Sequence, residues 1–248
     1  MRLTVVGCSG SYPGPASPAS CYLVEHDGYR LLLDLGSGAL GPLQRHVGLT
    51  EIDGIVLSHL HADHCLDVCP YVVFRRYHPD GVQPPLPLLG PTGTHARLSA
   101  AYDPTERAGL RDVFTFSALA PGERELGPFR CRFERMNHPV ETYGVRIEAG
   151  GASLTYSADT GTCDALVRLA EGSGTLLCEA SFPPGPDLPP NLHLTGREAG
   201  EHAAKAGVGR LLVTHVPPWT DAEQTSGEAA TSFDGPTELA VAGKTYEL

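Results

Sequence analysis

Short apolar runs recur along this chain, and polar, glycine or proline positions bound each of them. Runs of this kind, with continuous or alternating apolar residues, are typical of buried strands. They predict strands at residues 2–6, 21–25, 30–34, 53–57, 86–90, 129–133, 143–148, 153–157, 175–179 and 210–214. Segments between them with helical periodicity predict helices near residues 39–47, 64–77, 94–107, 162–171 and 196–206. This mixture, with hairpins at 21–34 and 143–157, predicts an α/β protein with two sheets sandwiched between helical layers.

The length of 248 residues supports a large buried core, and no internal repeat or linker divides the chain. We therefore expect one continuous domain over residues 1–248. The first apolar run is too short for a signal peptide, and none reaches the ~18 residues of a membrane helix. Seven cysteines, an odd number without regular spacing, fit a reducing compartment. These features predict a cytoplasmic protein with no membrane contact.

The most distinctive polar segment is SHLHADH, residues 58–64, which directly follows an apolar run. Imidazole and carboxylate groups are the ligands that zinc and similar divalent ions accept. Alternation sends the rings of His59 and His61 to the same side of an extended segment, whereas Asp63 and His64 open the helix that follows. The segment therefore predicts a metal site in which one loop serves two neighbouring ions.

Three isolated residues of the same ligand types lie further along, each where a predicted strand gives way to a loop. They are His138, Asp159 and His215. A single histidine at a strand end is usually a surface residue. Three such positions after a histidine-rich segment indicate the remaining ligands of a two-metal site.

Further motifs accompany these residues along nearly the whole chain. In chain order, the main ones are Asp34-Leu35-Gly36-Ser37-Gly38, His59-x-His61-x-Asp63-His64, His138, Asp159-Thr160-Gly161 and Thr214-His215. Together they resemble the metallo-β-lactamase fold superfamily. A second set resembles its ribonuclease Z-like branch, and comprises Gly7-Cys8-Ser9-Gly10-Ser11, residues 138–144, Cys178-Glu179-Ala180-Ser181 and His193-Leu194-Thr195. The stretch from Asn191 to Trp219 resembles actinobacterial enzymes described as atypical class II cyclic-nucleotide phosphodiesterases.

The resemblance implies a four-layer αβ/βα sandwich with metal ions at the edge where the strand-end loops converge. It also implies a role for each ligand. One ion would be bound by His59, His61 and His138, the other by Asp63, His64 and His215, and Asp159 would bridge the two. The cofactors would be two zinc ions, or manganese in their place. Family members are often homodimers, and the sequence itself leaves the oligomeric state open.

Two substitutions and one missing segment separate this chain from other branches of the superfamily. β-Lactamases of this fold carry cysteine where Asp159 stands, and flavodiiron-type members carry glutamate in place of His61, so neither activity is expected. Ribonucleases Z that process tRNA insert a long arm between His138 and Asp159, whereas this chain has 20 residues there, enough for a hairpin. A net charge of −11 also disfavours a long phosphate backbone such as that of tRNA.

The chemistry of the predicted site suits a phosphodiester, because two divalent ions can activate a water and hold a phosphoryl oxygen. A ribose 3′-oxygen leaves poorly without a proton, and the resemblance places a catalytic histidine at His193. As a general acid it would contribute roughly 10²–10⁴-fold. We expect Asp63, His193 and Glu179 to serve catalysis. Glu179 either orients a histidine of the site or is a structural carboxylate, and the sequence leaves both open.

Three other positions have two interpretations each. Asp34 either supports a metal ligand or forms a turn. Trp219 either stacks on a nucleobase or packs within the C-terminal loop. The basic pair Arg75-Arg76 is interpreted as a solvated helix face rather than a phosphate clamp.

Three functions fit these features. The first is a metal-dependent phosphodiesterase that opens a 3′,5′-cyclic nucleotide such as cyclic AMP to the 5′-monophosphate, and the motifs and the missing arm favour it. The second is a tRNA 3′-end endonuclease of the ribonuclease Z type. The third is a non-catalytic, metal-holding binding module, against which the complete ligand set and His193 argue.

Overall fold

The computed structural model describes residues 1–105 and 109–248. Within these residues, the strands form two seven-stranded sheets. In spatial order, the first sheet contains β14 (Thr245–Glu247), β1 (Arg2–Gly7), β2 (Cys21–His26), β3 (Tyr29–Leu33), β4 (Gly54–Val56), β5 (Leu86–Gly90) and β6 (Phe114–Ala118). The second contains β13 (Thr237–Leu239), β12 (Leu211–Thr214), β11 (Thr175–Glu179), β10 (Ala152–Tyr156), β9 (Tyr143–Ala149), β8 (Phe129–Arg135) and β7 (Gly122–Leu126).

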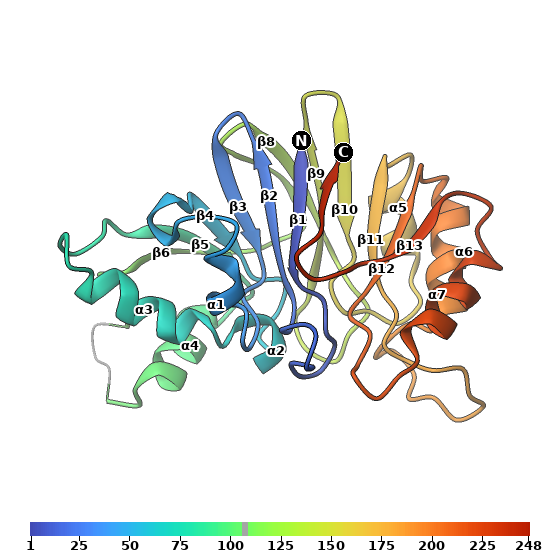
Figure 1. The fold of residues 1–248 in the computed structure, drawn as a ribbon, viewed down its shortest axis with the longest axis horizontal. Coiled ribbons are helices and arrows are strands. Elements are labelled where there is room, and N and C mark those ends of the chain that lie inside the picture. The colour runs from blue at the N-terminus through green and yellow to red at the C-terminus, as the bar shows by residue number, and fades with distance from the viewer. Residues whose placement is uncertain (106–108) are drawn as a thin grey trace.

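The two sheets face each other, and helices cover their outer faces (Figure 1). The helices are α1 (Leu40–Leu43), the 3-10 helix η1 (Leu49–Glu51), α2 (Ala62–Cys65), α3 (Val68–Tyr77), α4 (Thr94–Tyr102), α5 (Asp164–Ala170), α6 (Gly196–Ala206) and α7 (Ala222–Ala230). Helices α1 to α4 lie beside the first sheet and α5 to α7 beside the second (Figure 1). This confirms the predicted αβ/βα sandwich. In the described part of the chain, no helix is long and apolar enough to cross a membrane.

Inward-facing positions of both sheets build the core between them. Along β8, Phe129, Cys131 and Phe133 are buried, whereas the side chain of Arg130 between them is exposed. These three residues belong to the same apolar cluster as Leu3 of the first sheet. The outer faces are apolar too, with one cluster beneath α3 and α4 and another beneath α5 and α6. Because each sheet is apolar on both faces, the fold needs a layer of helices on each side.

Both predicted hairpins are present, and their turn residues explain them. The turn between β2 and β3 has positive φ at Asp27 (46°) and Gly28 (80°). The turn between β9 and β10 has positive φ at Gly150 (57°) and Gly151 (81°). Two successive residues with positive φ make the turn whose twist matches that of antiparallel strands. The hairpin between β9 and β10 thereby connects the segments that carry His138 and Asp159.

All ten predicted strands are present; two have the predicted ends and the others differ by one or two residues. The sequence analysis did not predict β6, β7, β13, β14 or α7. The sequence of β7 is GEREL, and four of its five residues are exposed. Strands β13 and β14 have three residues each, and α7 is mostly polar. Such segments lack the apolar pattern on which the prediction depended.

The predicted helix at 64–77 is in fact two helices, α2 and α3. Pro70 has no backbone N–H, so it is tolerated in the first turn of α3 but not in the interior of a longer helix. Between the helices, the Asp67 carboxylate accepts hydrogen bonds from the backbone N–H groups of Gly38 (3.0 Å) and Leu40 (2.8 Å). The predicted helix at 94–107 ends at Tyr102, and residues 106 and 107 of that prediction lie outside the described residues.

The basic pair on α3 does not form a solvated face, so that interpretation was wrong. Arg75 is only 4% exposed, and its guanidinium donates hydrogen bonds to the Tyr71 hydroxyl (3.1 Å) and the Pro84 carbonyl oxygen. Arg76 forms a two-pronged ion pair with Asp112, with N···O distances of 2.7 and 2.8 Å. Both guanidinium groups therefore serve contacts within the protein.

Candidate metal centre

The seven predicted ligands come together at one edge of the sandwich, where strands end and loops begin. From the first sheet, His59 and His61 follow β4, and Asp63 and His64 lie on α2. From the second sheet, His138 follows β8, Asp159 follows β10 and His215 follows β12. Each sheet thus supplies part of the centre, and His64 contacts His215 across 151 positions of sequence.

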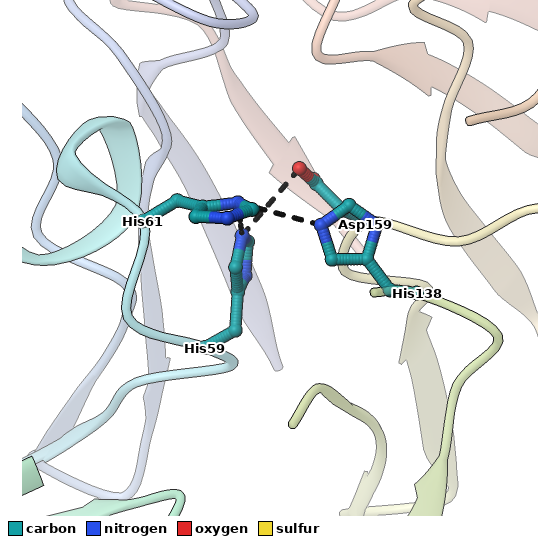
Figure 2. A group of neighbouring side chains, drawn as sticks. All are labelled: His59, His61, His138 and Asp159. Carbon is teal, nitrogen blue, oxygen red and sulfur yellow. Dashed lines mark hydrogen bonds and ion pairs between the residues drawn. The ribbon is translucent and has the colours of Figure 1, made fainter. Parts of the chain in front are cut away.

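Figure 2 shows the first group of ligands, formed by His59, His61, His138 and Asp159. The Nε2 atom of His59 lies 3.0 Å from Nδ1 of His61 and 3.5 Å from Oδ2 of Asp159. Nδ1 of His61 lies 3.4 Å from Nε2 of His138. Each ring turns one nitrogen toward the space shared by the four side chains.

The second group consists of Asp63, His64 and His215. Nε2 of His64 lies 3.0 Å from Nε2 of His215 and 3.5 Å from Oδ2 of Asp63. Nε2 of His215 lies 3.1 Å from the same Asp63 oxygen. Asp159 directs its other oxygen, Oδ1, to this group, 3.3 Å from Nε2 of His64. One carboxylate oxygen of Asp159 therefore faces each group, which is the placement that a bridging ligand needs.

The spacing of these donor atoms fits bound metal ions. Within the groups it runs from 3.0 to 3.5 Å. Metal–ligand bonds of about 2.0–2.2 Å at tetrahedral angles place neighbouring donors about 3.3–3.6 Å apart. Oδ1 of Asp159 is also buried without a hydrogen-bond donor among the described residues, and a buried anionic oxygen needs a cation to compensate it. The clusters can therefore hold divalent metal ions.

Neighbouring groups contact the other ring nitrogen of four of these histidines, among them His138 and His64. Nδ1 of His138 donates a hydrogen bond to the Leu192 carbonyl oxygen over 2.8 Å. Nδ1 of His64 donates to Oδ2 of Asp34 over 2.8 Å. A hydrogen bond of this kind fixes the tautomer and orientation of the ring. In both residues it turns Nε2 toward the other donor atoms of the same group.

Asp34 is fully buried and accepts hydrogen bonds from four donors. These are the Ser58 backbone N–H (2.7 Å), the Ser58 hydroxyl (2.8 Å), the Tyr156 hydroxyl (2.8 Å) and His64. Of the two interpretations of Asp34, its hydrogen bond with His64 fits the one in which Asp34 supports a candidate metal ligand.

Ser58, Tyr156 and Ser181 were not predicted as site residues, yet each contacts the centre or its supports. The Ser58 hydroxyl lies 3.0 Å from Nδ1 of His59. The Ser181 hydroxyl accepts a hydrogen bond from Nδ1 of His215 (2.7 Å) and donates one to the His215 carbonyl oxygen (2.8 Å). Ser181 lies within a motif that carried the resemblance, and Ser58 opens the SHLHADH segment, so each had a signal in the sequence. Tyr156 gave none, because a strand tyrosine is usually a core residue.

The backbone around the centre is packed closely. A Cβ atom at Gly36 would lie 1.9 Å from the Asp63 carbonyl oxygen, and one at Gly10 would lie 2.3 Å from that of His215. Only glycine fits at such positions. His215 itself has a φ of 57°, in the left-handed region that costs a residue with a side chain about 1–3 kcal/mol. The glycine-rich motifs at residues 7–11 and 34–38 therefore pack as tight turns against the loops of His215 and Asp63.

The electrostatics of the centre prepare most donors for metal binding. Burial lowers the pKa of His59, His61 and His138, so that these rings are neutral at pH 7. Burial raises the pKa of Asp159, but the charges of His215 and His64 outweigh it and hold that pKa well below its usual range. For His64, burial lowers the pKa, but the charges of Asp159 and Asp34 raise it by more than burial lowers it. The net pKa lies well above the ordinary value. A metal ion would displace that proton.

His193 lies beside the ligand groups. Its Nδ1 atom donates a hydrogen bond to Oε1 of Glu179 (2.9 Å) and lies 4.0 Å from Oδ2 of Asp159. Its ring centroid is 5.5 Å from that of His138 and 5.7 Å from that of His215. Burial lowers the pKa of His193, but the charge and hydrogen bond of Glu179, with the charge of Asp159, raise it to about 9. The ring is therefore protonated at neutral pH.

Glu179 is fully buried at the end of β11, and its carboxylate accepts hydrogen bonds from three groups of the site. Oε1 accepts hydrogen bonds from His193 and from the Thr160 backbone N–H (2.8 Å), and Oε2 accepts one from the Ser181 backbone N–H (3.1 Å). Of its interpretations, the contact with His193 corresponds to the orienting one. The same carboxylate also fixes the loop that follows Asp159.

A sandwich of this topology, with histidine and aspartate clusters that can hold metal ions at the sheet edge, is the arrangement of a metallo-hydrolase. The comparisons agree. Residues 29–216 match the family described as the beta-lactamase superfamily domain, and the chain belongs to this family.

Three relatives cover almost the whole chain. The uncharacterized protein ML1173 of Mycobacterium leprae is 49% identical over 253 residues, which is 100% of this chain and 89% of the relative. The probable metallo-hydrolase YhfI of Bacillus subtilis is 31% identical over 251 residues, 100% of each chain. Ribonuclease Z of Mycolicibacterium paratuberculosis is 32% identical over 269 residues, 96% of this chain and 95% of the relative. The crystal structure of YhfI has a TM-score of 0.89 at 29% identity, and covers 100% of this chain and 99% of that one.

Proposed function

We propose that the protein is a phosphodiesterase that uses two divalent metal ions, zinc or manganese, to open a 3′,5′-cyclic nucleotide such as cyclic AMP. The product is the 5′-monophosphate. The observation that carries the proposal is the position of Asp159 between two ligand groups, with the His193 ring, held by Glu179, beside it. Bound in these groups, the metal ions supply an acidified water and hold a phosphoryl oxygen.

The ligand residues divide as the geometry groups them. His59, His61 and His138 would hold one ion and Asp63, His64 and His215 the other, with one oxygen of Asp159 facing each group. The side chain of Asp63 is 11% exposed, so this carboxylate can also orient the attacking water, which is its proposed catalytic role.

His193 protonates the leaving group. As water attacks phosphorus, the bond from phosphorus to the ribose 3′-oxygen breaks, and Nε2 of His193 donates its proton to that oxygen. Nδ1 stays bonded to Glu179, which keeps the ring in place and stabilises its charged form. General acid catalysis of this kind is worth roughly 10²–10⁴-fold.

A small substrate is supported by the segment between His138 and Asp159. These residues, all of them described, form β9, the turn at Gly150 and Gly151, and β10, without an arm that could clamp tRNA. The net charge of −11 supports the same choice, because binding of a long phosphate backbone requires many cationic contacts.

Product analysis tests the proposal. Protein loaded with zinc or manganese is incubated with cyclic mono- and dinucleotides, precursor tRNA and lactones, and the products are separated by chromatography. We expect 5′-AMP from cyclic AMP, because the bond to the 3′-oxygen is the one that His193 assists. Cleavage of another substrate class with no turnover of any cyclic nucleotide would overturn the proposal.

A tRNA 3′-end endonuclease is the second candidate, and one observation favours it. A protein named ribonuclease Z is 32% identical to this chain over 96% of its length. Gel analysis of precursor tRNA, under the metal conditions used for cyclic AMP, separates the two activities. The third candidate, a non-catalytic metal-holding module, is excluded by measurable turnover of bis(p-nitrophenyl) phosphate.

A further inference from the structure

Two exposed aromatic side chains meet on loops that adjoin the metal centre. Tyr12 lies in the loop between β1 and β2, and Trp219 lies between β12 and α7. Their ring centroids are 5.0 Å apart, and the ring planes are tilted by 35°. Trp219 is 66% exposed and Tyr12 is 41% exposed. Both loops lie on the edge of the sandwich that carries α2 (Figure 1).

The loop of Tyr12 is fastened to the backbone beside the metal ligand His215. The Gly10 N–H donates a hydrogen bond to the Val216 carbonyl oxygen over 3.2 Å, and Gly10 packs directly on the His215 backbone. The Ser9 hydroxyl donates to the Tyr12 carbonyl oxygen over 2.7 Å. These contacts hold Tyr12 at a fixed position relative to the second ligand group.

A turn fixes the backbone of the loop that carries Trp219. The Thr220 N–H donates to the Pro217 carbonyl oxygen over 2.9 Å, which closes a turn that contains Trp219. Trp219 lies four positions after His215, so their Cα atoms lie at most ~14 Å apart even in a fully extended chain. The indole ring is therefore within reach of a ligand bound at the metals.

Exposure of these rings decides between the two interpretations of Trp219. Packing of the C-terminal loop would bury the indole, because a tryptophan has a large apolar surface to remove from water. With 66% of its surface exposed, the ring instead offers an open face. Planar aromatic faces of this kind stack on nucleobases.

We propose that Trp219 and Tyr12 form the subsite that binds the nucleobase of the substrate by stacking. The identity of the substrate rests on the proposed function, whereas the base contact can be tested without turnover. Because every base has a π-face, stacking alone discriminates weakly between bases. The subsite therefore predicts activity on cyclic nucleotides with purine and pyrimidine bases alike.

Binding is tested by intrinsic fluorescence, since the chain contains one tryptophan and its emission reports on Trp219 alone. The metal-loaded protein is titrated with 5′-AMP and with ribose 5-phosphate, which differ in the base. We expect saturable quenching by 5′-AMP only, and weaker 5′-AMP binding in Tyr12→Ala. Equal quenching by both ligands, or none by either, would overturn the subsite.

Kinetics provide the second test. Trp219→Ala should raise KM for cyclic AMP by about 5- to 150-fold, the equivalent of one lost base stack. The increase in KM for cyclic AMP should exceed, by the same factor, the increase in KM for base-free 1-deoxyribose 3,5-cyclic phosphate. Tyr77→Ala is the matched control, because Tyr77 is an aromatic residue on α3 that is 71% exposed, and it should leave KM unchanged.

Two outcomes separate this inference from its alternatives. If Trp219→Ala changes the oligomeric state measured by light scattering and leaves KM unchanged, the aromatic pair is an interface between copies and the inference fails. If the wild-type protein hydrolyses no cyclic nucleotide but shows base-dependent quenching, the proposed function fails while the base subsite stands.

Discussion

Replacement of His193 by alanine tests the assignment of the proton donor. The ring is held by Glu179 over 2.9 Å and has a pKa of about 9, so nearly all of it is in the acidic form at pH 7. The variant should therefore lose the full contribution of a general acid, roughly 10²–10⁴-fold in kcat for cyclic AMP. This corresponds to about 3–5 kcal/mol of transition-state stabilisation.

The assay compares two leaving groups in the same His193→Ala protein. The alkoxide from cyclic AMP needs a proton, whereas p-nitrophenolate from bis(p-nitrophenyl) phosphate is stable without one, so the second substrate should lose much less activity. Metal content, measured by mass spectrometry, should remain at the wild-type level. His78→Ala is the control, because His78 follows α3 and contacts none of the seven ligands.

Equal losses on both substrates would remove His193 from the general-acid role. Loss of metal from His193→Ala would place this residue among the ligands instead. That outcome is a real test, because donor atoms of Asp159, His193 and His215 lie within 4.8 Å of one another.

Three further predictions follow from the same geometry. Asp159→Ala should abolish turnover and lower the metal content, since one oxygen of Asp159 faces each ligand group; two tightly bound ions and a normal rate would contradict the bridging role. Glu179→Gln should move the basic limb of the pH–rate profile to lower pH. A general acid works only while protonated, so the wild-type rate should fall as pH rises toward the His193 pKa of about 9. Bound cations depress this pKa and move the fall in rate to lower pH. An unmoved limb would separate Glu179 from that titration. Hydrolysis of cyclic AMP should depend weakly on ionic strength, whereas a tRNA substrate with ~6–10 phosphate contacts would lose about 10³–10⁵ in affinity between ~50 and ~200 mM salt. A steep salt dependence would favour the endonuclease.

Buried elements of this fold could be predicted from the sequence, and edge elements could not. Every residue of β11 is buried, and burial on both faces requires the continuous apolar run that the sequence shows. By contrast, four of the five residues of β7 are exposed, and its contacts are the backbone pairing with β8 and the packing of Leu126 against the core. Strand β14 pairs with β1 in the register of Leu3 with Tyr246, and no local pattern encodes such a distant partner.

The clustering of the seven candidate ligands was predictable because their placement is largely local. The segment 58–64 brings four ligand groups together within a few residues, whatever the rest of the chain does. His138, Asp159 and His215 each follow a strand, and strand ends of packed sheets meet at a common edge. At these positions the residue type and its place after an apolar run were therefore visible in the sequence.

The contacts that orient the ligands were decided by the tertiary structure alone. The Tyr156 hydroxyl reaches Asp34 across 122 positions, and the Ser181 hydroxyl reaches His215 across 34. The rings of Tyr12 and Trp219 are likewise in contact although they lie far apart in the sequence. Local periodicity predicts which side of an element is buried, but nothing in the neighbouring sequence predicts which distant group a hydroxyl or ring contacts. That partner is set only when the two sheets pack against each other and their loops converge at one edge.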